Sequence, residues 1–204
     1  MNLKDYYYYF KSAIPERICD DIVKYGNQIK SEKAGIDHNN SGTELDLKRR
    51  NSNIVWTSDR WIYKEIQPYI HEANKRAGWN FKWDYCEPCQ ITTYGKDQYY
   101  DWHCDSWPEP YKKDKEVSSA FQGKIRKLSV TVSLSNSNDY EGGELEFDLK
   151  NKHPDETKNF VKCKEILPKG SLVVFPSFLW HRVCPVTSGE RNSLVIWCLG
   201  YPFI

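Results

Sequence analysis

The feature that most constrains the fold of this chain is a change in hydrophobic period near Phe81. Before it, apolar residues recur at steps of three and four residues over 15–29 and 59–77, which predicts two amphipathic helices. After it, short runs rich in β-branched and aromatic residues alternate with turn residues, which is typical of strands. The expected strands are 90–94, 99–105, 127–134, 143–147, 171–175 and 193–199. Two helices followed by many strands predict an α+β fold with helices packed on a β-sandwich or barrel.

Length and charge narrow the class of protein further. A chain of 204 residues is most simply one domain, and we expect a helical part over 1–80 and a β core over 81–204. The net charge of +1 creates no global field that would attract nucleic acid or an anionic membrane. The first 10 residues lack the apolar segment of a secretory signal, and no apolar run is long enough to span a bilayer. We therefore expect a cytoplasmic protein that does not enter a membrane.

The cysteines agree with that expectation. There are seven, an odd number at scattered spacings, and without a signal peptide this favours reduced thiols. Cys86 and Cys89 form a lone C-x-x-C pair, and no second pair completes a zinc site. We interpret these thiols as structural.

Two long polar segments have open interpretations. Residues 31–53 read as a loop that is either a connector without order or a lid over an active site. Residues 106–124 read as a solvated loop or as a flap over a substrate. Composition does not decide between these alternatives.

A candidate metal site stands out within the strand-rich half. His103 and Asp105 are two residues apart, so in a strand both would point to the same face. His181, near the end of another apolar run, can supply a third ligand, while Cys104 would point away. Two histidines and one carboxylate on one face of the metal form the facial triad of non-haem Fe(II) oxygenases. The alternative is a chance His-x-Asp pair and an ordinary core histidine.

Other residues around these three add to the pattern. Arg191 lies ten residues after His181, beyond a turn that would return the chain beside it, and arginine suits bidentate recognition of a carboxylate. The alternative for Arg191 is a surface salt bridge. Trp197 has the same strand parity as Arg191. Tyr94 and Tyr100 precede His103 by nine and three residues.

With these residues in place, the chain resembles the Fe(II)/2-oxoglutarate-dependent dioxygenases, in particular the prolyl 4-hydroxylase-like branch with its bacterial and phage relatives. The resemblance covers roughly residues 88–201. The matching blocks are Tyr94-Gly95, Gln98-Tyr99-Tyr100, His103-Cys104-Asp105, Lys127-Leu128-Ser129, Tyr140 to Leu145, Pro168 to Pro176, His181-Arg182-Val183, Pro185-Val186, Gly189-Glu190-Arg191 and Trp197.

The resemblance implies a double-stranded β-helix, or jelly roll, with helices on the outside. It also implies roles for eight residues. His103, Asp105 and His181 would bind Fe(II); Arg191 would pair with the far carboxylate of 2-oxoglutarate, which Tyr94 and Ser129 would help to hold; Tyr100 and Trp197 would face the reacting centre or the substrate. Many prolyl 4-hydroxylases have lysine in place of the arginine, so this departure concerns the substrate more than the cosubstrate.

The implied reaction couples decarboxylation of 2-oxoglutarate to succinate with hydroxylation of a C–H bond by O2, with ascorbate as an optional further cofactor. The expected substrate is proline in a peptide or protein. If the gene belongs to a phage, the expected location is the host cytoplasm. The alternatives are the same chemistry on a small molecule or nucleobase, and a jelly-roll binding module without catalysis. The near-neutral charge disfavours nucleic acid, and the oligomeric state stays open.

Overall fold

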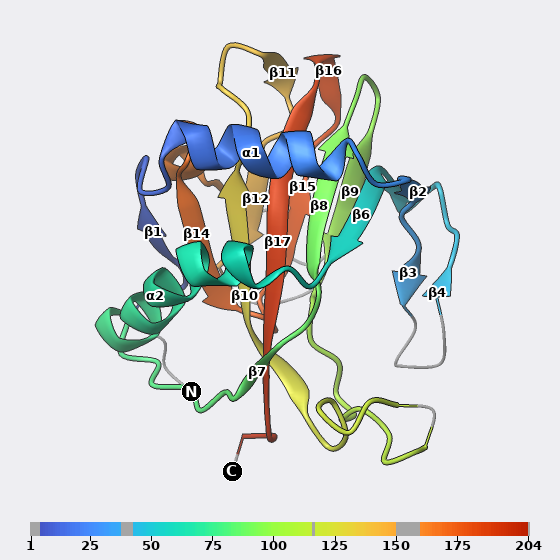
Figure 1. Ribbon diagram of the computed structural model, residues 1–204, viewed down its shortest axis with the longest axis vertical. Helices are drawn as coiled ribbons and strands as arrows, with labels where there is room; N and C mark the ends of the chain where they lie inside the picture. The colour runs from blue at the N-terminus through green and yellow to red at the C-terminus, as the bar shows by residue number, and fades with distance from the viewer. Residues whose placement is uncertain (1–4, 38–42, 116, 150–159, 204) are drawn as a thin grey trace.

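The computed structural model describes residues 5–37, 43–115, 117–149 and 160–203. Most strands belong to two antiparallel sheets (Figure 1). The larger sheet has the spatial order β1 (Tyr8–Phe10), β14 (Leu172–Pro176), β10 (Ile125–Ser133), β17 (Arg191–Gly200), β8 (Cys89–Tyr94), β6 (Asn53–Thr57) and β2 (Glu32–Lys33), with β7 (Tyr85–Cys86) also paired to β17. The smaller sheet has the order β13 (Phe160–Lys162), β12 (Leu145–Asp148), β15 (His181–Val183), β9 (Tyr99–His103) and β5 (Arg50–Asn51).

Shorter elements complete the described part of the chain. They are the paired strands β11 (Tyr140–Gly142) and β16 (Val186–Gly189), the paired strands β3 (Ile36–Asp37) and β4 (Thr43–Glu44), and the 3-10 helix η1 (Lys164–Ile166). No helix among the described residues is both long enough and apolar enough to cross a bilayer.

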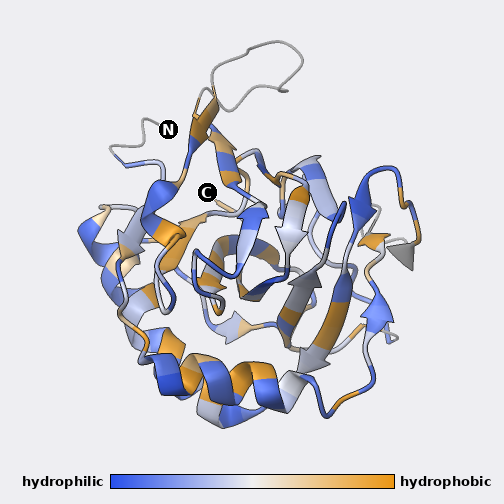
Figure 2. Ribbon diagram, turned by 90° about the horizontal axis from the view of Figure 1, so that it is seen from above, coloured by the Kyte–Doolittle hydropathy of each residue, from blue (hydrophilic) through white to orange (hydrophobic). Residues whose placement is uncertain are grey.

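Both expected helices form and cover one face of the larger sheet (Figure 1). They are α1 (Glu16–Gly26) and α2 (Arg60–Arg76). Apolar residues recur along each of them, between polar ones (Figure 2). Pro68 lies inside α2, yet the helix continues through it. Ile62, Ile66 and Ile70 are fully buried against the sheet, so this face is held by ordinary apolar packing.

Alternation along β10 separates the two faces of the larger sheet. Val130 and Val132 belong to the core beneath the helices. Ser129 and Thr131, which point the other way, are also buried, toward the smaller sheet. A second apolar cluster, which includes Phe147 of the smaller sheet and Phe175 of the larger, fills part of the space between the sheets. The rest of that space is lined by polar and aromatic side chains.

Two expectations about local structure need correction. The strand expected over 99–105 ends at His103, because Asp105 turns away and its N–H donates to the carbonyl of Ser177 (2.9 Å) rather than to a neighbouring strand. The segment 31–53 is not a continuous loop, since it contributes short strands to both sheets; its residues 38–42 lie outside the described part. Short edge strands in a polar sequence lack the apolar alternation from which strands are predicted.

Candidate active site

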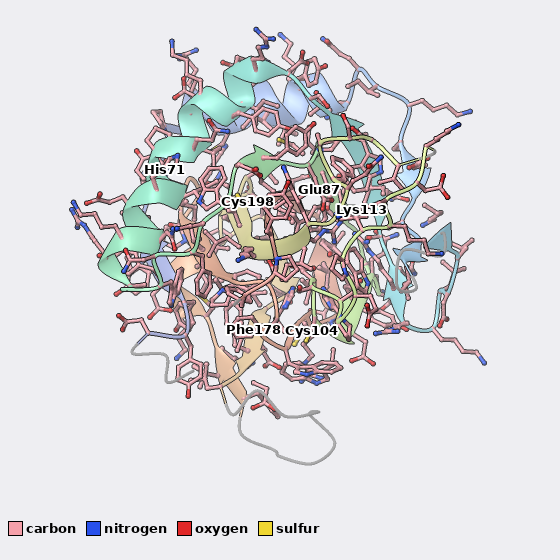
Figure 3. The ribbon with its side chains drawn as sticks, turned by 90° about the horizontal axis from the view of Figure 1, so that it is seen from below. His71, Glu87, Cys104, Lys113, Phe178 and Cys198 are labelled. Carbon is pink, nitrogen blue, oxygen red and sulfur yellow. The ribbon has the colours of Figure 1, made fainter. Side chains whose placement is uncertain are left out.

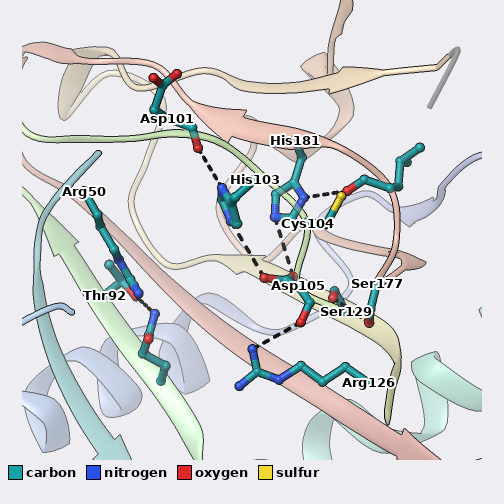
Figure 4. A network of polar contacts seen from close by, with 12 residues as sticks. Arg50, Thr92, Asp101, His103, Cys104, Asp105, Arg126, Ser129, Ser177 and His181 are labelled. Atoms are coloured by element: carbon teal, nitrogen blue, oxygen red, sulfur yellow. Dashed lines mark hydrogen bonds and ion pairs between the residues drawn. The ribbon is translucent and has the colours of Figure 1, made fainter. Parts of the chain in front are cut away.

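Three side chains converge between the two sheets, at the end of β9 (Figure 4). His103 and His181 pair across β9 and β15, and their ring centres are 4.1 Å apart. The Asp105 carboxylate lies below both, with its oxygens 3.7 Å from Nε2 of His103 and 3.5 Å from Nε2 of His181. All three groups offer ligand atoms within 4.8 Å of one another, so together they could hold one metal ion.

Backbone carbonyls fix the orientation of both imidazoles. Nδ1 of His103 lies 2.7 Å from the carbonyl oxygen of Asp101, and Nδ1 of His181 lies 2.9 Å from that of Leu179. Because a carbonyl only accepts, Nδ1 is assigned the proton in each ring, and the lone pair of Nε2 then faces the carboxylate. This is the tautomer required of a metal-binding histidine, and the carbonyl contact is the usual way to select it.

The charges of the three groups also suit a metal. Burial, followed by the proximity of His181, holds the pKa of His103 well below its usual range, so this imidazole is neutral. Burial alone would raise the pKa of Asp105, but His181, His103 and Arg126 together lower it. Neutral imidazole nitrogen and a carboxylate form the donor set of mononuclear non-haem iron sites, in which further coordination positions stay open.

The larger sheet supports Asp105 from below. Ser129 Oγ lies 2.9 Å from Ser177 Oγ, and a hydrogen bond from Ser129 helps to lower the pKa of the Asp105 carboxyl (Figure 4). Nη1 of Arg126 lies 3.5 Å from the Asp105 carbonyl oxygen. The carboxylate is therefore held by residues of both sheets although it lies outside any strand.

Arg191 is a buried cation on the inner face of the larger sheet, paired opposite Tyr94. Its side chain is only 4% exposed, and its guanidinium carbon lies 5.5 Å from the centre of the Tyr94 ring. Nη1 approaches Ser193 Oγ at 3.4 Å, and no ion pair within the described ranges includes it. Gly143 leaves it space, because a Cβ there would lie 2.9 Å from Arg191 Cδ. A buried unpaired cation is costly, and a ligand carboxylate, such as that of 2-oxoglutarate, would offset this cost.

A cavity of about 770 Å³ adjoins the three groups. It is lined by Glu32, Lys33, Gly35, Ile36, Leu45, Arg49, Arg50, Ile54, Trp56, Gln90, Tyr100, His103, Cys104, Asp105, Ser106, Trp107, Pro108, Arg126, Trp180 and Trp197. Both polar segments, 31–53 and 106–124, contribute to its wall. The Tyr100 ring stacks on His103 with ring centres 3.5 Å apart, and the Arg50 guanidinium lies 4.4 Å above the other side of Tyr100. The cavity therefore joins the triad to an aromatic and cationic wall.

A buried ion pair in that wall was not expected from the sequence. Arg126 binds Glu87 through two hydrogen bonds of 2.7 and 2.5 Å, and its guanidinium lies between the rings of Trp107 and Trp197, at 4.7 and 4.1 Å. Burial would lower the pKa of Arg126, but Glu87 more than offsets this and raises it. The Tyr111 hydroxyl also donates to Glu87 (3.1 Å), which fastens segment 106–124 to the cavity. Both residues lie just outside the strands expected over 90–94 and 127–134, so no sign of their pairing is visible in the sequence.

The structure brings the eight predicted site residues to the space between the sheets. His103, Asp105 and His181 form the converging triad described above. Tyr94 adjoins Arg191, Ser129 adjoins Asp105, and Tyr100 and Trp197 line the cavity. Cys104 turns its thiol to the carbonyl of Phe178 (3.1 Å).

An antiparallel sandwich with two imidazoles and a carboxylate converging between its sheets defines the class of mononuclear iron oxygenases. The chain belongs to the 2OG-Fe(II) oxygenase superfamily, whose family model matches residues 89–199. A PKHD-type hydroxylase from Synechococcus sp. (strain CC9311) is 33% identical over 198 residues, which cover 92% of this chain and 76% of that protein. The chain is therefore a dioxygenase that uses Fe(II) and 2-oxoglutarate, with a hydroxylase activity.

Solved structures confirm the jelly-roll fold. A prolyl-4-hydroxylase from Pseudomonas putida has a TM-score of 0.70 at 17% identity, with 96% of this chain and 93% of that chain covered. A prolyl hydroxylase from Trichoplax adhaerens, solved with a peptide fragment of the hypoxia inducible factor oxygen degradation domain, has a TM-score of 0.65 at 18% identity. That match covers 96% of this chain and 84% of the other. The expected α+β class with outer helices is thus confirmed.

Proposed function

We propose that this dioxygenase hydroxylates proline within a peptide or protein segment. The observation that carries the proposal is the cavity between the triad and the ring-lined wall, which extends well beyond the three converging groups. Its volume exceeds what one pyrrolidine ring would fill, and tryptophan and tyrosine faces suit extended proline-containing segments. The peptide bound to the Trichoplax relative supports the same class of substrate.

We assign iron binding to the triad. His103, Asp105 and His181 would hold Fe(II) on one side, and the metal would supply the oxidising chemistry when O2 and 2-oxoglutarate are present. The protein's own contribution is orientation. The carbonyls of Asp101 and Leu179 keep both imidazoles in the ligating tautomer, and we propose that Ser129 steadies the Asp105 carboxylate.

We assign recognition of 2-oxoglutarate to Arg191 and Tyr94. The buried guanidinium would neutralise the far carboxylate, and the tyrosine beside it would flank the bound cosubstrate. A direct contact of Ser129 with the cosubstrate remains a prediction.

We assign the substrate side to Tyr100 and Trp197. Both line the cavity, and Nε1 of Trp197 is a buried donor without a partner among the described residues. A peptide carbonyl would satisfy that donor. The aromatic faces would hold the pyrrolidine ring so that one C–H bond points at the metal.

The direct test incubates the protein with Fe(II), ascorbate, 2-oxoglutarate and proline-containing peptides, and follows succinate together with product mass. The expected product is heavier by ~16 Da, one oxygen atom, in proportion to succinate. Tandem mass spectrometry should place the oxygen on proline. Peptides of the same sequence with alanine for proline serve as the matched control.

Other outcomes would revise the substrate. Coupled turnover only with free amino acids, another small molecule or a nucleobase would overturn the peptide proposal and leave the oxygenase assignment in place. Anaerobic addition of Fe(II) and 2-oxoglutarate, read as a visible charge-transfer band, tests the assigned metal and cosubstrate residues without any substrate.

A further inference from the structure

We propose that Cys86 and Cys198 form a redox modification site on the helix-facing side of the larger sheet, in which a hydroperoxide converts the two thiols into a disulfide joining β7 to β17. The proposal does not depend on the identity of the hydroxylated substrate. The strongest evidence is distance. The two sulfur atoms lie 3.4 Å apart although the residues are 112 positions apart in the chain.

The backbone favours this bond. Cys86 and Cys198 are direct partners in the antiparallel pairing of β7 with β17. In the adjacent pair, the Glu87 N–H donates to the Trp197 carbonyl at 2.9 Å. The cysteines therefore occupy a non-hydrogen-bonded position, where facing side chains come closest and Cα atoms are within the range that disulfides span.

The two thiols differ in the way that a disulfide-forming pair requires. Cys86 is half-buried, so a small oxidant can reach it, while Cys198 is fully buried. The hydrogen bond between the two thiols lowers the pKa of Cys86, and the side-chain amide of Gln67, 3.7 Å from that sulfur, acts in the same direction. Burial raises the pKa of Cys198. Cys86 is thus the thiol that reacts first, and Cys198 is the resolving thiol.

The chemistry balances with hydrogen peroxide as the oxidant. The Cys86 thiolate attacks one peroxide oxygen, the O–O bond breaks, and a sulfenic acid forms while the other oxygen leaves as water after protonation. The Cys198 sulfur then attacks the sulfenic sulfur and expels a second water. Two thiols and one peroxide give one disulfide and two waters.

The two thiols lie on the opposite face of the sheet from the cavity, but their chain neighbours reach the substrate wall. Glu87 and Trp197, the chain neighbours of the two cysteines, both contact Arg126 in the cavity wall. Figure 3 labels Cys198 and Glu87 close to each other in the middle of the view. Drawing the sulfurs together moves these neighbours. Oxidation is therefore expected to alter turnover of the substrate while leaving iron and 2-oxoglutarate binding in place.

The test treats the metal-free protein with hydrogen peroxide, which avoids iron-catalysed side reactions, then alkylates remaining thiols and maps peptides without reduction. The expected result is a Cys86–Cys198 crosslink about 2 Da lighter than the separate peptides, because two hydrogen atoms leave, and reversible by a dithiol reductant. Cys86→Ser and Cys198→Ser should each abolish it. Cys184→Ser, which removes another half-buried thiol, should not.

Two outcomes would overturn the proposal. One is a Cys86–Cys89 crosslink in place of the expected one, and the other is full alkylation of both cysteines after peroxide has oxidised other thiols. A second measurement compares melting temperatures. The linked protein should melt roughly 5–15 °C higher than the reduced protein, an increase absent from Cys86→Ser; no increase in fully linked protein would contradict the claim that the bond fastens β7 to β17.

Discussion

The two faces of the larger sheet are equally buried but chemically different. Toward the helices, β10 and β17 present residues such as Val130 and Ile196, which are fully buried in an apolar core. Toward the smaller sheet, the same strands present Ser129, Arg191 and Trp197, whose exposed fractions are 0%, 4% and 6%. Burial alone would not distinguish the two faces; the polarity of the buried atoms does.

The difference shows which face supplies stability and which supplies function. On the helix side the buried core is mainly apolar packing, which gains free energy on folding. On the inner side the described residues include two buried polar atoms without hydrogen bonds, Gln90 Oε1 and Trp197 Nε1, and both belong to residues that line the cavity. Unsatisfied buried groups cost stability unless a ligand completes them. The inner face is therefore built for bound molecules at some expense in stability.

The largest effect is expected from Asp105→Ala on the inner face. Losing the only carboxylate of the triad should lower hydroxylation at least about 100-fold, because changes to residues that merely orient ligands already cost about 10–100-fold. This loss of activity is measured as the turnover of 2-oxoglutarate in the presence of Fe(II). The matched control is Asp101→Asn, an exposed acid on the preceding strand β9, which should retain activity. Equal losses in both variants would argue against the triad.

Arg191→Gln should have the next largest effect. Removing the charged partner of a buried carboxylate costs about 2–5 kcal/mol. The dissociation constant for 2-oxoglutarate should therefore rise about 30- to 5,000-fold. The melting temperature without ligand should not fall, because the free protein loses an unpaired buried cation. The exposed Arg17→Gln is the control. Unchanged cosubstrate affinity in Arg191→Gln would refute the assignment.

Ile66→Val probes the helix-facing side of the larger sheet. Removing one methyl group from this fully buried side chain should cost about 0.5–1.5 kcal/mol, or roughly 2–5 °C in melting temperature. The Michaelis constants for 2-oxoglutarate and substrate should stay the same. Lys64→Ala, at an exposed position of the same helix, should change stability by no more than about 0.5 kcal/mol. A change in cosubstrate affinity with Ile66→Val would show that the two faces are not independent.

The helix-facing side of the sheet was predictable from sequence because it follows a single rule. Apolar period alone indicated both helices and most of the long strands, and the termini differ by only a few residues, as for α2 (Arg60–Arg76) against the expected 59–77. The same rule misses β5 and the turn that ends β9 at His103, where hydrogen bonds to distant residues decide the conformation.

The candidate site divides in the same way. His103, Asp105, His181 and Arg191 were predicted as site residues from residue type, spacing and family resemblance, because each has distinctive chemistry at a fixed place. The Glu87–Arg126 pair was not, since 39 positions separate its members and their pairing depends on how β7 and β10 flank β17. Contacts made only by tertiary packing leave no local pattern in a single sequence.

The smallest effect, and the sharpest test of the inner face, is expected from Trp197→Phe. The substitution removes Nε1, which has no partner among the described residues. It keeps an aromatic ring at a position where the indole lies 4.1 Å from the Arg126 guanidinium and 5.9 Å from the Trp56 ring. Because no internal hydrogen bond is lost, the free energy of unfolding should change by no more than about 1 kcal/mol. If the indole donates to the substrate, the Michaelis constant for a proline peptide should rise about 2- to 10-fold, the equivalent of one neutral hydrogen bond. Iron and 2-oxoglutarate binding should remain as in the unmodified protein. A larger rise in the Michaelis constant for 2-oxoglutarate than for the peptide would assign Trp197 to cosubstrate binding instead of substrate binding.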